Sequence, residues 1–343
     1  MKKILIVRRD NIGDLVCTLP LLEAIKAQEP DSQLYAYVNR YNAPILQHYV
    51  SQHARPDPTK VLAGYWAYQK DKHRLPGETR LGIFWQRWKQ AQQMRQHQFD
   101  WVLLAGGIND STLRWAQWLK PTQIVRQDQL AQYAGAHEVE RTCSLLTALG
   151  LPYQTPVATL RPDSATASLL ASTLPAHLPV QRVAIHISAR KPSQRWPVGH
   201  FIELANTLAA QGLGVLLFWA PGSAQDPTHP GDDDKLRHIL AQCDRRHVVP
   251  VRTDTLSELI AGLDLAQSVI CADGGAMHVA AALGKPIVAL FGDSEASRWH
   301  PWGVPHVVLQ DPARDVQHLT VSQVFTAWQG LLTDGAVIKP PIG

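Results

Sequence analysis

The sequence predicts an α/β protein with two doubly wound parallel sheets, one in each half of the chain. Three observations support this prediction. The chain has 343 residues, 45% of them hydrophobic, which is more than one core usually serves. Short apolar runs alternate with segments of helical periodicity. A proline-rich stretch interrupts that alternation near the middle. The expected domains are therefore residues 1–165 and 166–343.

The first half opens with a strand, helix and second strand. The apolar run at 3–7 is typical of a buried parallel strand, and apolar residues recur at helical spacing from Leu15 until Pro30 stops the helix. Further strands are expected at 34–38 and 99–105. Residues 51–98 are poorly periodic and rich in Lys, Arg and Trp, so they predict a long functional loop or a helical excursion.

The alternation restarts after the prolines of residues 151–180. The apolar patterns predict strands at 182–187, 214–219, 248–249, 268–272 and 286–291. They predict helices at 199–211, 235–243, 256–263 and 275–283. A last amphipathic helix near 321–332 is able to pack on either domain.

Composition and charge limit the classes of function. The net charge is +4, and the excess of Lys and Arg falls in residues 1–165. A basic half suits nucleic acid, an anionic membrane or an acidic substrate, but no nucleic-acid-binding motif is present. The four cysteines lack the spacing of a metal site. No apolar run is long enough for a signal peptide or a membrane span, so we expect a cytoplasmic protein. We also expect no bound metal, because the cysteines lack metal-site spacing.

Ligands of open α/β sheets bind beyond the carboxyl ends of the strands, and three turns there carry unusual residues. The first turn contains Gly13 and Asp14, directly after the opening strand. Gly13 permits close approach of a ligand. Asp14 has two interpretations, a helix cap and a functional carboxylate.

The second turn follows the strand at 182–187 and holds Ser188, Arg190, Lys191 and Arg195. Clustered cations and a hydroxyl at a strand end suit phosphate oxygens, although a solvated surface loop has the same composition.

The third turn, Asp273-Gly274-Gly275, leads from a strand into a helix that contains Met277 and His278. Backbone N–H groups at such a helix start bind anions, and the glycines let a diphosphate approach. Tight helix packing and a partly buried histidine are the structural alternative.

Other nucleotide-dependent classes fit less well. The first turn lacks GxGxxG, and no P-loop is present. The run Asp232–Asp234 suggests metal ligands, but three acids before a helix more often stabilise its N-terminus.

Three blocks in order resemble glycosyltransferase family 9, the ADP-heptose:lipopolysaccharide heptosyltransferases. These are the opening ILIVRRDNIGDLVCTLPLLEAIK, the central RWPVGHFIELANTL, and DGGAMHVAAALGKPIVALFG followed by RWHPWG. The resemblance implies a GT-B fold, in which two Rossmann-like domains face each other, with the acceptor on the N-terminal side and the donor on the C-terminal side. It also implies an inverting, metal-independent transfer that needs no cofactor, with ADP-heptose as the donor substrate.

The resemblance also implies roles for individual residues. Asp14 matches the family's IGD aspartate, the candidate general base. Ser188 takes the place of a hydroxyl near the phosphates, and an acid of Asp232–Asp234, with Asp233 preferred, takes that of a ribose-binding carboxylate. The donor-binding turn matches Asp273, Gly274, Gly275, Met277 and His278.

Two departures from the family pattern concern the donor side. Gln194 stands where many members have a lysine, which leaves Lys191 or Arg195 as the phosphate-binding cation. Gly-Asp293-Ser294-Glu295 replaces the usual Gly-Pro-Thr-Asp and puts the contacts with the donor sugar in doubt.

The basic first half suits an acidic, lipid-linked saccharide acceptor, with Lys70, Lys72 and Arg74 as candidate contacts. The same cations also suit peripheral contact with the cytoplasmic face of the inner membrane. Two alternatives remain open from the sequence, a nucleotide-sugar 2-epimerase and a non-catalytic nucleotide-sugar-binding protein.

Overall fold

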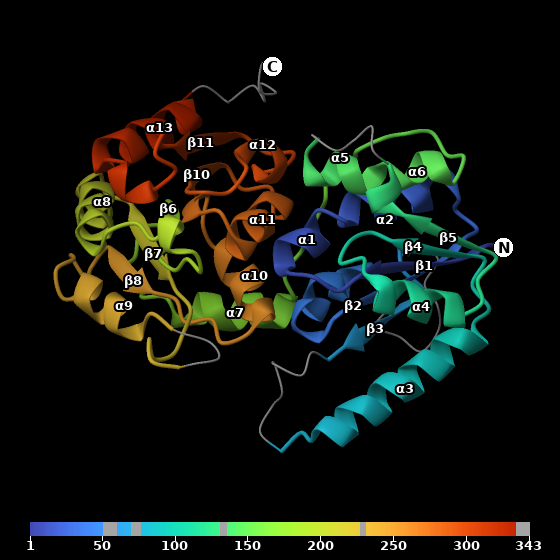
Figure 1. Ribbon diagram of the computed structural model, residues 1–343. Coiled ribbons are helices and arrows are strands. Elements are labelled where there is room, and N and C mark those ends of the chain that lie inside the picture. Colours follow the sequence, from blue (N-terminus) through green and yellow to red (C-terminus); the bar gives the residue numbers. More distant parts are fainter. Residues whose placement is uncertain (51–59, 70–76, 131–135, 227–230, 334–343) are drawn as a thin grey trace. The chain divides into compact units, whose positions relative to one another are not determined.

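The computed structural model consists of two compact units, Met1–Ala158 and Thr159–Gly343, shown as a ribbon in Figure 1. It describes all residues except 51–59, 70–76, 131–135, 227–230 and 334–343. The division lies a few residues before the expected boundary of 165/166. Leu160 explains the difference, because its N–H donates to the carbonyl of Ala282 in the second unit.

The described strands of the first unit form one parallel sheet in the order β3-β2-β1-β4-β5. The buried run that the sequence predicts at its start is the central strand, because β1 pairs with β2 on one side and β4 on the other. The strands are β1 (Lys3–Arg8), β2 (Gln33–Asn39), β3 (Gly64–Tyr68), β4 (Trp101–Leu104) and β5 (Gln123–Arg126).

Helices cover both faces of this sheet (Figure 1). The side chains of β1, β2 and β4 alternate between the faces, and those of one face pack on Met94 and Ala116 in α3 and α4. The helical segments are α1 (Ile12–Val16), α2 (Leu19–Gln28), η1 (Arg40–Tyr49), α3 (Arg80–Gln96), α4 (Asp110–Trp118), η3 (Gln127–Gln129), α5 (Glu138–Cys143) and α6 (Leu145–Ala148).

The second unit contains a parallel sheet in the order β11-β10-β9-β6-β7-β8. Its strands are β6 (Arg182–His186), β7 (Gly214–Phe218), β8 (Val248–Pro250), β9 (Ser268–Ala272), β10 (Ile287–Phe291) and β11 (His306–Gln310). Its helical segments are α7 (Ser164–Thr173), η5 (Pro192–Gln194), α8 (Val198–Ala210), α9 (Asp233–Leu240), α10 (Leu256–Asp264), α11 (Gly275–Ala282), α12 (Ala296–Trp299), η6 (Val316–His318) and α13 (Val321–Thr333).

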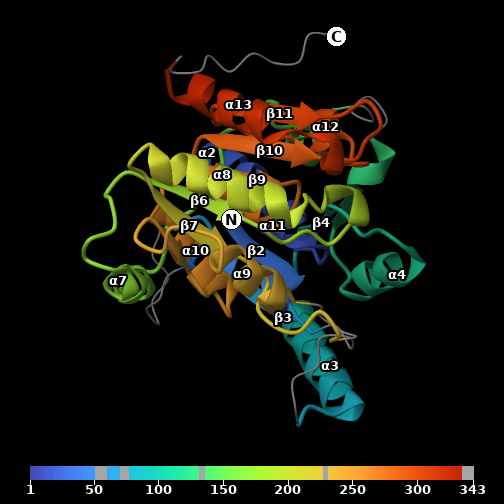
Figure 2. The same ribbon diagram turned by 90° about the vertical axis from the view of Figure 1, so that its left-hand side faces the viewer.

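In the second unit α8, α9 and α13 cover one face of the sheet, and α10 and α11 cover the other (Figures 1 and 2). The last helix, which the sequence left free to pack on either domain, packs on this sheet. Val324, Trp328 and Leu331 of α13 are buried in the core of the second unit. The Trp328 indole N–H also donates to Ser268 Oγ over 2.9 Å.

Each sheet has a point at which the strand order reverses. In the first unit it lies between β1 and β4, and in the second between β6 and β9. Connections leave these neighbouring strands in opposite directions, so their carboxyl ends open a crevice that commonly binds ligands. The three turns singled out in the sequence follow β1, β6 and β9.

The described part of residues 51–98 is more regular than its composition indicates. It contains β3 and the 17-residue helix α3, so the long-loop alternative is wrong and the helical excursion is confirmed. The first predicted helix is two helices, α1 and α2, because the chain turns at Cys17 and Thr18. No strand was expected at β5 or β11, which are short or only half-buried edge strands.

All four cysteines are free thiols. Cys17, Cys143 and Cys271 are buried, and Cys243 is partly buried. Burial raises the pKa of each thiol, to about 12 for Cys143. They pack as small apolar side chains.

Helix α10 packs so closely on the sheet that only glycine fits at position 262. A Cβ there would lie 2.6 Å from Cε1 of Phe218, a ring that is fully buried. We expect Gly262→Ala to lower the free energy of unfolding by about 1–3 kcal/mol because the core is overpacked. Differential scanning calorimetry measures this as a lower Tm.

Gly199→Ala in α8 is the matched control, because outside the adjoining residues and backbone of its own helix no described heavy atom lies within 4 Å of its added Cβ. Alanine favours a helix over glycine, so the Tm of this variant should stay or rise slightly. Equal Tm values for the two variants would contradict the packing argument.

Candidate active site

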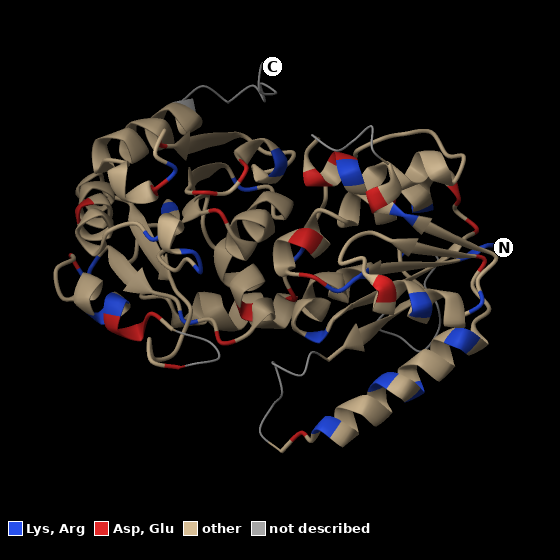
Figure 3. Ribbon diagram, in the orientation of Figure 1, with Lys and Arg blue, Asp and Glu red and all other residues tan. Residues whose placement is uncertain are grey.

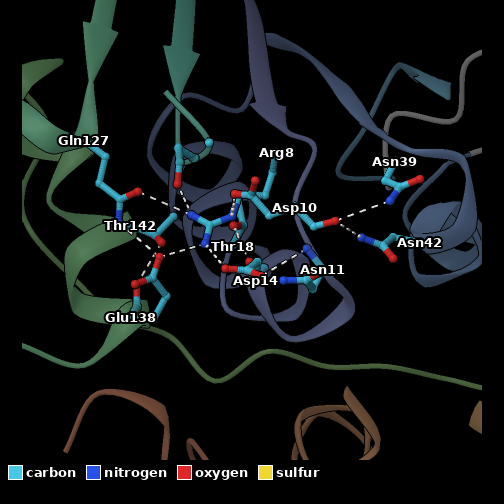
Figure 4. A network of polar contacts seen from close by, with 12 residues as sticks. Arg8, Asp10, Asn11, Asp14, Thr18, Asn39, Asn42, Gln127, Glu138 and Thr142 are labelled. Atoms are coloured by element: carbon cyan, nitrogen blue, oxygen red, sulfur yellow. Dashed lines mark hydrogen bonds and ion pairs between the residues drawn. The ribbon is translucent and has the colours of Figure 1, made fainter. Parts of the chain in front are cut away.

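The first unit holds a buried cation, Arg8, at the end of β1 (Figure 4). Its side chain is 2% exposed. One guanidinium nitrogen, Nη2, lies 2.7 Å from Asp14 Oδ1 and 2.7 Å from Glu138 Oε1. Nε lies 3.4 Å from Asp10 Oδ2. Three carboxylates from two distant parts of the chain therefore converge on one charge.

Neutral groups complete the surroundings of Arg8. Nη1 donates to the carbonyl of Ala105, directly after β4, and to Gln127 Oε1 over 3.3 Å. The Gln127 amide in turn donates to Glu138 Oε1 over 3.4 Å. The network thus ties the ends of β1, β4 and β5 to α5 (Figure 4).

The carboxylates decide the charge state of Arg8. Burial alone would lower the pKa of its guanidinium, but Asp14, Glu138 and Asp10 together raise the pKa above its ordinary value. Arg8 is a permanent cation, and its field stabilises negative charge on Asp14.

Asp14 lies one turn into α1 rather than at its cap. Asn11 is the N-cap, and Asp14 is the N3 residue of a capping box, in which its Oδ2 accepts the Asn11 N–H over 3.0 Å. The cap interpretation is therefore half correct, because one oxygen caps the helix and the other binds Arg8. Both contacts fix the carboxylate, whose side chain is 15% exposed.

A second carboxylate, Asp10, sits against the turn after β4. A Cβ on Gly106 would lie 2.7 Å from Asp10 Oδ2, and one on Gly107 would lie 2.5 Å from Oδ1. Gly107 also has a φ of +58°. The backbone carbonyl of Asp10 accepts from the amides of Asn39 and Asn42. The paired glycines therefore give Asp10 its place beside Arg8.

Arg9 was not a candidate in the sequence, yet aromatic rings surround it. Its guanidinium carbon lies 4.9 Å from the ring centre of Tyr68, 5.7 Å from Tyr37 and 5.8 Å from Trp115. Its Nη2 donates to Thr112 Oγ1. These contacts hold a second cation at the carboxyl end of β1.

In the second unit, Gln194 joins the turns after β6, β9 and β10. Its amide donates to Asp273 Oδ2 and to Ser294 Oγ, both over 2.9 Å, and its side chain is buried. Asp273 is held further by its own N–H, which donates to the carbonyl of Leu290. A neutral bridge thus occupies the position where the family resemblance suggests a lysine.

The two candidate cations differ in placement. Lys191 Nζ lies 3.1 Å from Asp293 Oδ1 and 3.2 Å from Ser294 Oγ, so it shares Ser294 with Gln194. Arg195 folds back on its own loop and donates to the carbonyls of Ala189 and Arg190. Of the two cations, Lys191 is therefore the one that contacts the turn after β10, where Gln194 also binds.

Helix α11 begins at Gly275, directly after Asp273 and Gly274. Its first N–H groups have no partner within the helix and so suit an anion. Met277 is 0% exposed and belongs to the core, so only its backbone is available to a ligand. His278 is buried at 4% exposure, with its ring edge toward Trp299 at 6.0 Å between centres.

Ser188 and Asp233 are both engaged in contacts beside the turn after β7. Ser188 Oγ accepts the Ala220 N–H over 2.8 Å. Asp233 is the first residue of α9, and its Oδ1 accepts the Trp219 indole N–H over 2.7 Å. That hydrogen bond lowers the pKa of Asp233. Burial lowers the pKa of the neighbouring His186 to about 4, so its ring is neutral.

The candidate acceptor residues Lys70, Lys72 and Arg74 lie outside the described residues. Within the described chain, no group of three His, Cys, Asp or Glu side chains is placed to hold a metal ion. No helix among the described residues is long and apolar enough to cross a membrane.

Comparison with known proteins gives a consistent family. The model of glycosyltransferase family 9 (heptosyltransferase) matches residues 87–323. Lipopolysaccharide heptosyltransferase 1 of Escherichia coli K12 is 25% identical over 94% of this chain and 98% of its own. Lipooligosaccharide heptosyltransferase 2 of Haemophilus influenzae is 35% identical, but the match covers only 29% of this chain and 28% of that protein.

Solved structures share the architecture over nearly the whole chain. A family 9 glycosyltransferase from Veillonella parvula has a TM-score of 0.78, with 17% identity, and covers 96% of this chain and 97% of its own. An E. coli heptosyltransferase solved with ADP has a TM-score of 0.71, with 21% identity, and covers 96% and 99%. These likenesses confirm the GT-B fold class.

We expect Arg8→Met to lower the free energy of unfolding by about 3–5 kcal/mol, because the buried Glu138 carboxylate and its neighbours lose their cation. Chemical denaturation followed by tryptophan fluorescence measures the change. Adding Glu138→Gln to Arg8→Met should restore part of the loss, since the two residues are in contact.

The matched control is Arg126→Gln, which removes a partly exposed arginine of the same unit that pairs with Asp128. Surface ion pairs contribute little, so this variant should unfold nearly as the wild type does. If Arg8→Met is as stable as the control, the network does not hold the unit together.

Proposed function

The chain belongs to glycosyltransferase family 9, the heptosyltransferases, and from this membership we propose that it transfers a heptose from ADP-heptose to an acidic lipopolysaccharide core acceptor. The observation that carries the proposal is the placement of Asp14. It is the carboxylate that Arg8 and a capping box fix at the strand-order reversal of the first unit.

We propose that Asp14 is the general base. Its carboxylate takes the proton of the acceptor hydroxyl as that oxygen forms a bond to the anomeric carbon of the heptose. The bond between that carbon and the ADP oxygen breaks, and ADP leaves with the electron pair. A single displacement of this kind inverts the anomeric configuration. Arg8 orients Asp14 through the 2.7 Å ion pair and is a positioning residue.

The donor diphosphate is proposed to bind at the start of α11. The N–H groups at the start of this helix face the phosphates in our proposal. Lys191, which donates to Ser294 Oγ, supplies a positive charge to the diphosphate. These groups stabilise the departing ADP, which in our proposal needs no metal ion. In this proposal Ser188, Asp233 and His278 complete the donor site, and Arg195 is the alternative cation.

The acceptor is proposed to bind to the first unit. Arg9, held among three aromatic rings at the end of β1, adds a described cation to the earlier candidates Lys70, Lys72 and Arg74. A core oligosaccharide with acidic groups suits cations of this kind. Such an acceptor is lipid-linked, so the reaction would take place at the cytoplasmic face of the inner membrane.

The epimerase and the non-catalytic binding protein are not favoured, because the matched family is one of glycosyltransferases. Product analysis distinguishes the three. A transferase gives a glycosylated acceptor only when donor and acceptor are both present. An epimerase gives free sugar without an acceptor, and a binding protein gives no product.

We expect Asp14→Asn to lower kcat at least about 100-fold, within the usual range for loss of a general base, while ADP affinity stays unchanged. Steady-state transfer assays and calorimetry measure the two quantities. The amide keeps the size of the side chain, so circular dichroism should match the wild type.

Asp10→Asn is the comparison variant, since Asp10 also lies beside Arg8 but is not part of the IGD motif. It should retain much more activity than Asp14→Asn. A larger loss for Asp10→Asn would transfer the role of base to Asp10.

For the donor site, we expect ADP to raise the Tm without magnesium and in the presence of a chelator. Lys191→Gln should weaken ADP binding about tenfold or more, because it removes a charged contact with the diphosphate. Arg195→Gln should weaken ADP binding much less, since its guanidinium lies on its own loop. The reverse order would assign the phosphate to Arg195, and ADP binding only with added metal would refute the metal-independent proposal.

A further inference from the structure

Helix α3 exposes an apolar stripe that the transfer reaction does not use. Leu81 is 73% exposed, Phe84 60%, Trp85 60% and Trp88 48%. Their spacing of three and four residues places all four on one side of the helix. The rings contact one another, with 5.5 Å between the centres of Trp85 and Trp88. Large exposed apolar groups gathered in this way mark an interaction surface.

The opposite side of α3 is fixed to the first unit. Ile83 and Met94 are buried, and the Gln90 amide donates to the carbonyl of Ala67 over 3.1 Å. Arg87 donates to the carbonyl of Gln69, and its guanidinium carbon lies 4.5 Å from the ring centre of Tyr68. These contacts leave the helix no freedom to turn its apolar stripe inward.

The charge on α3 has one sign. Arg80, Arg87, Lys89 and Arg95 lie within the helix, which contains no Asp or Glu (Figure 3). Arg80 and Lys89 are exposed on the two margins of the apolar stripe. Leucine and aromatic residues between cations are the composition of helices that lie in the interface of an anionic bilayer.

We propose that α3 is a membrane-surface anchor that inserts Leu81, Phe84, Trp85 and Trp88 among the lipids of an anionic bilayer. Arg80 and Lys89 then lie at the level of the headgroup phosphates. At 17 residues with four cations, the helix lies along the surface rather than across the membrane. Trp prefers this interfacial depth.

Charge complementarity favours lipid over a second copy of the chain. An isologous contact between two α3 helices would bring like charges together without an acidic partner in either helix. A bilayer that contains phosphatidylglycerol supplies the negative charge and the apolar layer at once. The inference goes beyond the proposed transfer and is independent of which sugar is transferred.

The test is co-sedimentation of the full chain with vesicles of phosphatidylethanolamine and phosphatidylglycerol at low salt, without donor or acceptor. The wild type should bind, and should bind less to vesicles of phosphatidylcholine alone. The double variant Trp85→Ser/Trp88→Ser should bind at least about tenfold more weakly, because its apolar insertion is lost. Arg80→Gln/Lys89→Gln should also bind more weakly, and its loss should shrink at high salt.

The matched control is Leu169→Ser/Val180→Ser, which removes two apolar side chains that are 66% and 81% exposed in the second unit. It should bind vesicles as the wild type does. Thermal unfolding of each variant shows whether it is folded, and the altered side chains are exposed enough to leave the Tm nearly unchanged.

Two results would overturn the inference. One is a wild type that does not bind anionic vesicles, and the other is a folded Trp85→Ser/Trp88→Ser variant that binds as well as the control. Sedimentation velocity tests the alternative, a second copy of the chain. If the wild type is a dimer and the Trp85→Ser/Trp88→Ser variant is a monomer, the stripe is a dimer interface. Transfer to a delipidated acceptor is assayed separately, so loss of vesicle binding leaves the proposed reaction testable.

Discussion

The first unit depends on one desolvated cation. Arg8 is buried at the end of the central strand, where an unpaired charge would strongly destabilise the fold. Glu138 and Asp14 compensate it at 2.7 Å each, and Ala105 and Gln127 accept hydrogen bonds from its Nη1. Removing any one of these partners leaves part of the buried charge of Arg8 uncompensated. The ends of three strands and the start of α5 are therefore held in one arrangement, with the Asp14 carboxylate at its surface.

In the second unit a neutral side chain, rather than a buried cation, joins the turns at the ends of the strands. The Gln194 amide donates to both Asp273 and Ser294. Burying a neutral amide here avoids the desolvation penalty that a buried lysine ammonium would carry. The positive charge is on Lys191 instead, a partly exposed side chain that pairs with Asp293. A ligand phosphate would compete with Asp293 for this lysine.

Local patterns predicted much of the fold. The strands at β1, β9 and β10 are continuous apolar runs, and the helix starts after β6 and β9 carry their own signals, so these elements were predicted nearly to their bounds. Elements with weak local signals were missed, such as β11, in which every residue is only partly buried. The Asp-Gly-Gly turn was also located correctly.

What the sequence does not predict is long-range pairing. Arg8 and Glu138 are separated by 130 positions, and neither position alone indicates a buried ion pair. The best available signal was an arginine directly after a buried strand, which required a carboxylate from somewhere in the chain. The same limit applies to Gln194, whose partners lie 79 and 100 positions away. The roles of Asp14 and of the donor turn stay predictions.

The buried cysteines allow local unfolding of each unit to be measured separately. Cys17 and Cys143 lie in the first unit and Cys271 in the second, and the burial that raises each thiol's pKa also keeps reagents from the sulfur. A thiol-specific reagent would therefore modify these three cysteines slowly, at a rate set by local unfolding. The sequence position of each modified cysteine then identifies the unit that opened. The modification rates therefore report the local stability of the two units separately.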